Sequence, residues 1–398
     1  MVIDSVDFFY AAMPHITLDA DGSQDALLVR VRSGDHIGWG ECEASPLTSI
    51  AAFVAPRSHG VCQPVAASVL GQAIDSPNDI RRIGALVARN SMDLLQAAHT
   101  WSGIEIALWD LLGHAKGEPV WKLLGYTSTT PKVPYASMLM GSTPQDTLEA
   151  VARVVADGFY AVKIGWSGYG EGTPEADADQ VAAAREALGP DGILLVDAGQ
   201  IWIDDVDAAA SRLAALEQNR VTWVEEPFEP HAFAAHTALA TRARGVGIAA
   251  GEGAHTVPMA TNLIDYGGVS FIQVDAARIG GISAAKQVAD HAVAKSITFV
   301  NHTFTSHLAL SASLQPFAGL GDHRLCEYPA HPSALATAIA ARPLNLIDGE
   351  LWAPDAPGLG VEVDLDRLSP FLRNVEISVD GECLFASGQH PTTVREPV

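Results

Sequence analysis

Residues 193–200 read ILLVDAGQ, a short apolar run that ends in Asp197 and leads into a turn. Such a run is typical of a buried strand in a parallel sheet. The pattern returns on both sides along the chain, where AVKIG at 161–165 carries Lys163 and VTWVE at 221–225 ends in Glu225. Stretches with helical spacing follow these runs, and strands that alternate with helices predict a parallel sheet.

Eight such runs lie between residue 131 and residue 345, and eight units favour a closed (β/α)8-type, TIM-like barrel over an open sheet. The runs are 132–138, 161–165, 193–198, 221–227, 247–252, 271–277, 297–302 and 325–329. The helices expected between them include 145–155, 177–188, 206–216, 284–293 and 306–314.

The segments before and after the barrel predict an α+β capping domain. In residues 1–130, an alternating run at 26–32 and a second extended run at 37–41 indicate a hairpin, and 101–116 has helical spacing up to Gly117. Residues 44–75 are rich in Ala, Pro, Ser and Gly, which indicates a long loop followed by a helix. Residues 346–398 return to short strand-like pieces, 351–352, 375–378 and 382–385, which we expect to pack back on the cap.

Composition excludes several classes of protein. The formal net charge of −23 disfavours a nucleic-acid partner, because an acidic surface repels phosphate backbones. No apolar run approaches the roughly 18 residues that span a bilayer, and the N-terminal residues have no signal-peptide pattern. The four cysteines form no CxxC pair and indicate reduced thiols. We therefore expect a cytoplasmic protein without a membrane partner.

Ionisable residues stand at the ends of seven of the eight runs, spaced 23 to 34 residues apart. Each such acid could instead cap the next helix or meet solvent. In a barrel, however, strand ends converge on one face, where active sites lie. Asp197, Glu225 and Glu252 would then place three carboxylates together, and these stay ionised only around a cation. Carboxylate oxygens favour Mg²⁺ over zinc.

His302 and Lys163 extend this cluster. Asp275, one unit before His302, can hold the imidazole in one tautomer and raise its basicity, which is the arrangement of a general base. The alternative for His302 is a satisfied core histidine. Lys163 either reaches solvent or supplies positive charge to an anionic ligand.

The ordered series of motifs resembles the enolase superfamily, in particular its mandelate racemase-like acid-sugar dehydratases and racemases. The matching stretches are GWGEC at 38–42, SGIEIALWDLLGHAKGEPVWKLLG at 102–125, VDAGQ at 196–200, EEP at 225–227, GE at 251–252, DAARIGG at 275–281 and EYP at 327–329. The resemblance implies Mg²⁺ ligation by Asp197, Glu225 and Glu252. It also implies a His302–Asp275 dyad, with Glu327 on the intermediate and Lys163 as the first lysine of a Lys-x-Lys motif.

The sequence departs from that family pattern at two places. Gly165 stands where many members carry the second lysine, and Gly199 replaces the usual asparagine. A racemase needs an acid and a base on opposite faces of the carbanion, so we expect a dehydratase that removes water from an acid sugar, with His302 as base and then acid. A racemase, epimerase or cycloisomerase on the same scaffold is the alternative.

Other expectations rest on the resemblance alone. Cap loops at 13–23 and 44–59 would set specificity, with His15, Arg57, His59 and Trp166 as candidate substrate residues, although the first three could equally be solvated. The family's assemblies imply a homo-oligomer. A carboxylate-binding protein without catalysis, and a metal-free structural barrel, remain the non-enzyme alternatives.

Overall fold

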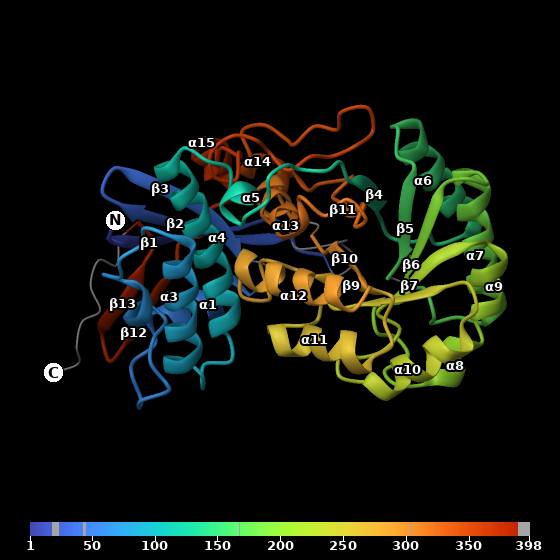
Figure 1. Cartoon of the computed structure of the whole chain (residues 1–398), viewed down its shortest axis with the longest axis horizontal. Coiled ribbons are helices and arrows are strands. Elements are labelled where there is room, and N and C mark those ends of the chain that lie inside the picture. The colour runs from blue at the N-terminus through green and yellow to red at the C-terminus, as the bar shows by residue number, and fades with distance from the viewer. Residues whose placement is uncertain (18–23, 43–44, 167, 304, 389–398) are drawn as a thin grey trace.

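The computed structural model describes residues 1–17, 24–42, 45–166, 168–303 and 305–388. The described elements from β1 to α5 form a cap that lies beside a barrel (Figure 1). The cap has an antiparallel sheet in the order β1-β2-β3, covered by helices. Its elements are β1 (Ser5–Ala12), β2 (Asp25–Ser33), β3 (His36–Cys42), α1 (Pro46–Val54), α2 (Ala66–Val69), α3 (Pro77–Asn90), α4 (Ala97–Lys116) and α5 (Val120–Leu123).

The predicted hairpin is confirmed, because β2 and β3 pair antiparallel around a turn at Gly34. The predicted loop after residue 44 is wrong in part, since α1 occupies 46–54. Pro46 opens that helix, and Ile50 and Phe53 are buried one turn apart, a helical spacing that the small residues around them concealed. Helix α4 ends at Gly117 in the left-handed conformation, as predicted.

Eight parallel strands form the barrel in the order β10-β9-β8-β7-β6-β5-β4-β11. They are β4 (Val133–Ser137), β5 (Ala161–Gly165), β6 (Ile193–Asp197), β7 (Val221–Glu225), β8 (Gly247–Ala250), β9 (Phe271–Val274), β10 (Thr298–Asn301) and β11 (Leu325–Tyr328). The helices between and after them are α6 (Pro144–Ala156), α7 (Pro174–Leu188), α8 (Val206–Ala210), α9 (Leu213–Gln218), α10 (Phe233–Arg242), α11 (Val257–Tyr266), α12 (Ile282–Ala294), α13 (His307–Leu314) and the short η1 (Gln315–Phe317).

The helix predicted over 206–216 is broken into α8 and α9. The break falls at Ser211 and Arg212. Arg212 is buried there, and its Nε lies 3.0 Å from Asp177 Oδ2 on α7. The tertiary contact of Arg212 coincides with the interruption that the sequence pattern did not indicate.

The alternation of side chains along each strand explains why ionisable residues reach the mouth of the barrel. Leu195 and Trp223 belong to the apolar cluster that fills the barrel interior. Asp197 and Glu225 follow them by two residues, and side chains two apart on a strand share a face. The carboxylates therefore extend the inward-facing column of each strand to its C-terminal end.

Helix α4 joins the cap to the barrel. Glu105 accepts hydrogen bonds from the backbone N–H of Ile282 (2.7 Å) and Ser283 (2.9 Å), the first two residues of α12. Trp109 Nε1 donates to the same carboxylate at 2.8 Å. Gly281 is required here, because a Cβ at this position would lie 2.0 Å from Glu105 Oε2. The cap thus provides the N-terminal cap of a barrel helix.

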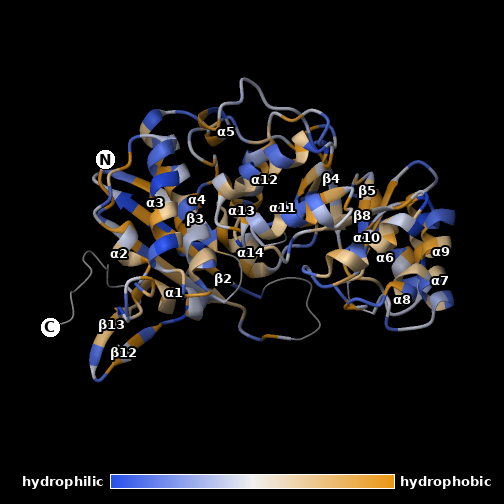
Figure 2. Cartoon of the chain, turned by 60° about the horizontal axis from the view of Figure 1, so that its bottom comes forward, coloured by the Kyte–Doolittle hydropathy of each residue, from blue (hydrophilic) through white to orange (hydrophobic). Residues whose placement is uncertain are grey.

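The C-terminal segment returns to the cap. It contains α14 (Ala334–Ile339), α15 (Leu365–Leu368), η2 (Ser369–Phe371), β12 (Glu376–Val379) and β13 (Glu382–Ala386). Arg373 N donates to Tyr10 O at 2.8 Å, and the Phe385 ring packs against Phe8 of β1. The β12–β13 hairpin projects from this end of the molecule (Figure 2). The strand predicted at 351–352 is only an isolated bridge between Leu351 and Lys132.

Two further features agree with the composition. Among the described helices, none has the length and apolarity that a bilayer crossing requires. The cysteines Cys42, Cys62, Cys326 and Cys383 are all free, as the absence of a CxxC pair predicts.

We expect Glu105→Ala to lower the free energy of unfolding by about 3–5 kcal/mol. The change leaves the backbone N–H groups of Ile282 and Ser283 without their acceptor, and each loss costs about 1–3 kcal/mol, whereas Trp109 Nε1 keeps a second acceptor, Ser283 Oγ, at 3.0 Å. Urea unfolding measures the effect. Glu186→Ala, which removes an exposed glutamate of α7, is the matched control and should change the free energy by no more than about 0.5 kcal/mol. Equal losses of unfolding free energy in the two variants would contradict a stabilising contact between Glu105 and α12.

Candidate active site

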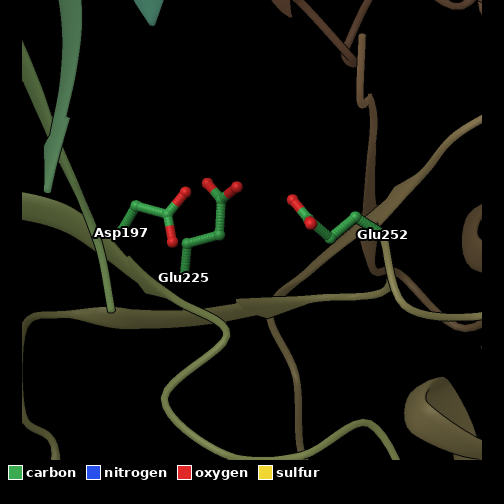
Figure 3. Close-up of side chains that lie close together, drawn as sticks. All are labelled: Asp197, Glu225 and Glu252. Atoms are coloured by element: carbon green, nitrogen blue, oxygen red, sulfur yellow. The ribbon is translucent and has the colours of Figure 1, made fainter. Parts of the chain in front are cut away.

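Three carboxylates meet at the C-terminal mouth of the barrel. Asp197 ends β6, Glu225 ends β7 and Glu252 follows β8. One oxygen from each lies within 4.8 Å of the others. Figure 3 shows Asp197 and Glu225 side by side, with the Glu252 carboxylate facing them from the opposite side. The three strand-end acids therefore converge in the structure, as the sequence predicts.

Lys163 lies among the carboxylates. Its Nζ is 2.5 Å from Glu225 Oε1, 2.9 Å from Glu327 Oε1 and 3.2 Å from Asp197 Oδ2. Burial lowers the pKa of Lys163, but the surrounding carboxylates outweigh burial and hold it well above its ordinary value. Lys163 therefore carries a positive charge inside the barrel mouth.

One lysine does not balance this much negative charge. Burial raises the pKa of Glu225 well above its ordinary value and also raises that of Asp197, although Lys163 opposes both shifts. Trp223 Nε1 orients Glu225 from below with a 2.9 Å hydrogen bond to Oε2. A cluster of buried, oriented carboxylate oxygens with a deficit of positive charge has the donor chemistry that a hard divalent cation requires. The three carboxylates therefore fit such an ion.

His302, the residue directly after β10, faces the cluster. Its Nδ1 is 2.8 Å from Asp275 Oδ2, and its Nε2 is 3.0 Å from Glu252 Oε2. Burial lowers the pKa of His302, but Glu252, Glu327 and the hydrogen bond with Asp275 outweigh burial and hold it well above the ordinary value. The converse holds for Glu252, whose pKa is lowered because His302 and Arg278 overcome the effect of burial. The imidazole is thus held against the acidic cluster rather than in the apolar core.

Glu327 completes the constellation. Its side chain is fully buried on β11, with Oε1 against Lys163 and Oε2 accepting a 2.7 Å hydrogen bond from Thr303 N. His302 Nε2 lies 3.9 Å from Glu327 Oε2. The four residues for which the sequence suggested catalytic roles, Lys163, Asp275, His302 and Glu327, are thus brought together with the three carboxylates.

Gly165 has no room for the second lysine. A Cβ at this position would lie 2.1 Å from Asp197 O, and φ is +125°. The next residue, Trp166, donates its N–H to that same oxygen at 2.7 Å, and its ring lies against Gly199, where a Cβ would be 2.6 Å from Cδ1. Trp166 is 52% exposed, so an indole surface lies beside the turn that follows Asp197.

The other predicted substrate residues lie elsewhere. His59 Nε2 pairs with Asp93 Oδ2 at 2.9 Å within the cap. His15 and Arg57 are exposed on cap segments, and no described contact joins either of them to the carboxylates. Residues 18–23 and residue 44 of the predicted specificity loops lie outside the described residues.

Sequence reasoning gave no role to Glu226 or Arg278. Glu226 accepts hydrogen bonds from Gln200 Nε2, Gly251 N (3.4 Å) and Gly253 N (3.2 Å), so it ties together the turns after β6, β7 and β8. Arg278 Nη1 lies 3.4 Å from Glu252 Oε1. The position of Glu226 directly after Glu225 was the only indication of its role in the sequence. Its hydrogen-bond partners come from other turns and depend on the fold.

Comparison with known proteins places this geometry in context. Residues 8–125 match the family model of the mandelate racemase/muconate lactonizing enzyme N-terminal domain, and residues 146–367 match the enolase C-terminal domain-like model. The crystal structure of a predicted mandelate racemase from Rhodobacter sphaeroides is 59% identical, with a TM-score of 0.94 over 98% of this chain and 100% of that chain.

Two relatives with named activities are more distant. D-galactarolactone cycloisomerase of Agrobacterium fabrum is 29% identical over 365 residues, which are 87% of this chain and 90% of that protein. L-talarate/galactarate dehydratase of Salmonella typhimurium is 31% identical over 311 residues, which are 74% of this chain and 71% of that protein. The chain is thus similar both to a cycloisomerase and to a dehydratase of acid sugars.

We expect Asp197→Asn to weaken Mg²⁺ binding at least tenfold, because the change removes one negative charge and one oxygen donor from the cluster; outer partners of metal ligands alone contribute about 10–100-fold. Calorimetric titration of the metal-depleted protein measures the dissociation constant. Glu229→Gln removes a partly exposed carboxylate after β7 and is the matched control. Unchanged affinity in the Asp197 variant would exclude Asp197 as a ligand.

Proposed function

Because the chain belongs to the mandelate racemase/muconate lactonizing enzyme family of the enolase superfamily, we propose that it is a Mg²⁺-dependent acid-sugar dehydratase. It removes the proton α to the substrate carboxylate and then eliminates the β-hydroxyl as water. The observation that carries this proposal is the His302–Asp275 pair facing a three-carboxylate cluster and a buried lysine. The names of both relatives refer to galactarate, as its lactone in the cycloisomerase and as the acid in the dehydratase.

Asp197, Glu225 and Glu252 would hold the Mg²⁺. The ion supplies positive charge that stabilises the enediolate formed when the α-proton leaves. Lys163 contributes a second positive charge from β5, where its ammonium is already oriented by Glu225 and Glu327. Preorganised charges of this kind need no rearrangement during the reaction, and they act more strongly away from bulk water.

His302 acts as the base through Nε2. Asp275 Oδ2 accepts a hydrogen bond from the Nδ1–H of His302 at 2.8 Å, so the tautomer and the ring orientation are fixed. Glu252 serves both the imidazole and the carboxylate cluster. A cation bound by the three carboxylates would share the negative charge of Glu252 and would thus weaken one of the interactions that raise the pKa of His302.

The protonated His302 then returns its proton to the departing β-hydroxyl. The C–H bond breaks at the α-carbon, the C–O bond breaks at the β-carbon, and water leaves with the proton that His302 took. The enol that remains tautomerises to a 2-keto-3-deoxy acid. Glu327, which lies between Lys163 and His302, would contact the enediolate oxygen during this sequence.

The one-sided arrangement favours elimination over racemisation. A base at position 165 would need a side chain where the backbone of Asp197 leaves no room. The adjacent Trp166 has an indole side chain, which cannot act as an acid or a base toward the α-carbon of the substrate. A single base at His302 is sufficient for dehydration but not for a two-base inversion.

Cycloisomerisation is the second candidate, because the match to D-galactarolactone cycloisomerase extends over 87% of this chain. It needs the same α-proton chemistry at His302 but breaks a ring bond instead of releasing water. The two outcomes differ in product, since only the dehydratase releases water and forms a keto acid from an open-chain acid sugar.

We expect His302→Asn to lower turnover by about 10²–10⁴-fold, because general base catalysis contributes about that much. A panel of mono- and diacid sugars, assayed for keto-acid formation and for α-deuterium exchange in D₂O, measures the effect. Mg²⁺ affinity should be retained. His291→Asn, which alters another histidine next to an aspartate, on α12, is the matched control.

Three outcomes would count against this assignment. Normal dehydration by the His302 variant would exclude His302 as the base. Deuterium incorporation with inversion and no keto acid would favour a racemase or epimerase, and a ring-opened isomer formed from a lactone would favour a cycloisomerase. If the wild-type protein exchanged the α-proton of none of the acid sugars, the proposed chemistry would be rejected.

A further inference from the structure

The barrel has one seam without a backbone ladder. Each described strand pairs with its neighbour from β10 round to β11, but β10 and β11 themselves, at the two ends of the sheet order, share no ladder. These are the strands that lead to His302 and carry Glu327. The relative position of two site residues therefore depends on whatever replaces the missing ladder.

The side chain of Asn301 takes the place of a strand neighbour. Its Oδ1 accepts a hydrogen bond from Glu327 N at 2.9 Å, and its Nδ2 donates to Glu327 O at 3.3 Å. A neighbouring parallel strand would use the same two backbone groups in a ladder. Asn301 is fully buried, and its Nδ2 also donates to Ser313 Oγ at 3.0 Å, which fixes the amide orientation.

Two more hydrogen bonds run along the same seam. Near the start of β10, Phe299 N donates to His323 Nδ1 at 2.7 Å. At the mouth, Thr303 N donates to Glu327 Oε2 at 2.7 Å. Hydrogen bonds between side chains and backbone thus close the seam at Phe299, Asn301 and Thr303. The bonds at Asn301 and Thr303 both hold Glu327.

We propose that Asn301 is a positioning residue that holds Glu327 in register with His302 across this seam. The residues on both sides of His302 in the chain, Asn301 and Thr303, bond to the backbone and the carboxylate of Glu327. We call the two hydrogen bonds between the Asn301 side chain and the backbone of Glu327 the Asn301 clasp. Without this clasp, β11 would shift relative to β10, and the 3.9 Å spacing between His302 Nε2 and Glu327 Oε2 would change. The metal ligands stand on β6, β7 and after β8, away from the seam, and would be unaffected.

Amide hydrogen exchange tests the clasp without any substrate. In Asn301→Ala, the amides of Glu327 and Thr303 should lose protection, while Mg²⁺ affinity changes by no more than about twofold. Two matched controls exist. Ser313→Ala removes the other partner of Nδ2 and should leave both amides protected, and His323→Ala should expose only the Phe299 amide.

Turnover tests the consequence, and this part rests on the proposed function. Asn301→Ala should lower kcat by about 10–100-fold with KM changed less than about threefold, because a displacement of about 1 Å in a catalytic site costs up to about 10²-fold. Asn301→Asp keeps the acceptor for Glu327 N and loses the donor to Glu327 O, so it should fall between wild type and Asn301→Ala. It also serves if the alanine variant does not fold.

Retained protection of Glu327 and Thr303 in Asn301→Ala would overturn the proposal. An equal loss of kcat in His323→Ala would also overturn it, because the effect would then be general destabilisation of the seam. If the wild-type protein turns over no acid sugar, the proposed function fails. The amide exchange measurements still show whether Asn301 holds Glu327 in place.

Discussion

The structure depends on the convergence of like charges on a buried lysine and an imidazole. Asp197, Glu225 and Glu327 all lie within 3.2 Å of Lys163 Nζ, in a place where water cannot screen them. Such a cluster costs free energy unless positive charge offsets it. The barrel maintains the cluster because each side chain continues an inward-facing column of a strand, so moving one carboxylate away would require a shift in strand register.

Further buried carboxyl groups attach the cap to the rest of the chain. Glu105 of α4 caps α12, and Asp110, also on α4, accepts hydrogen bonds from Trp39 N of β3 and from Leu359 N of the C-terminal segment. A further buried acid, Glu41 at the end of β3, accepts a hydrogen bond from the Ser306 hydroxyl beside α13, and burial raises the pKa of Glu41 to about 7. The cap therefore contacts the barrel through hydrogen-bonded carboxyl groups near the segment that carries His302.

The departures from the common family pattern form one connected unit. Gly165 allows the chain to turn against Asp197 O, Trp166 follows with its N–H on that oxygen, and Gly199 makes room for the indole. Restoring a lysine at position 165 alone would therefore clash with the backbone of β6. At the end of β5 the chain carries an exposed indole and has no room for a side chain at position 165, which is the physical basis for proposing one-base chemistry.

The sequence by itself determined the strand ends and hence the central site. A period of two places Lys163, Asp197 and Glu225 on the same face as the buried residues before them, and the spacing of βα units brings successive strand ends to one rim; both rules are local. Only the tertiary structure decided which residues hold that site in place. Glu105 meets α12 from 177 residues away, Asn301 meets Glu327 across an unpaired seam, and His59 pairs with Asp93 instead of reaching the site. Contacts of this kind depend on how distant segments pack, and no local period encodes them.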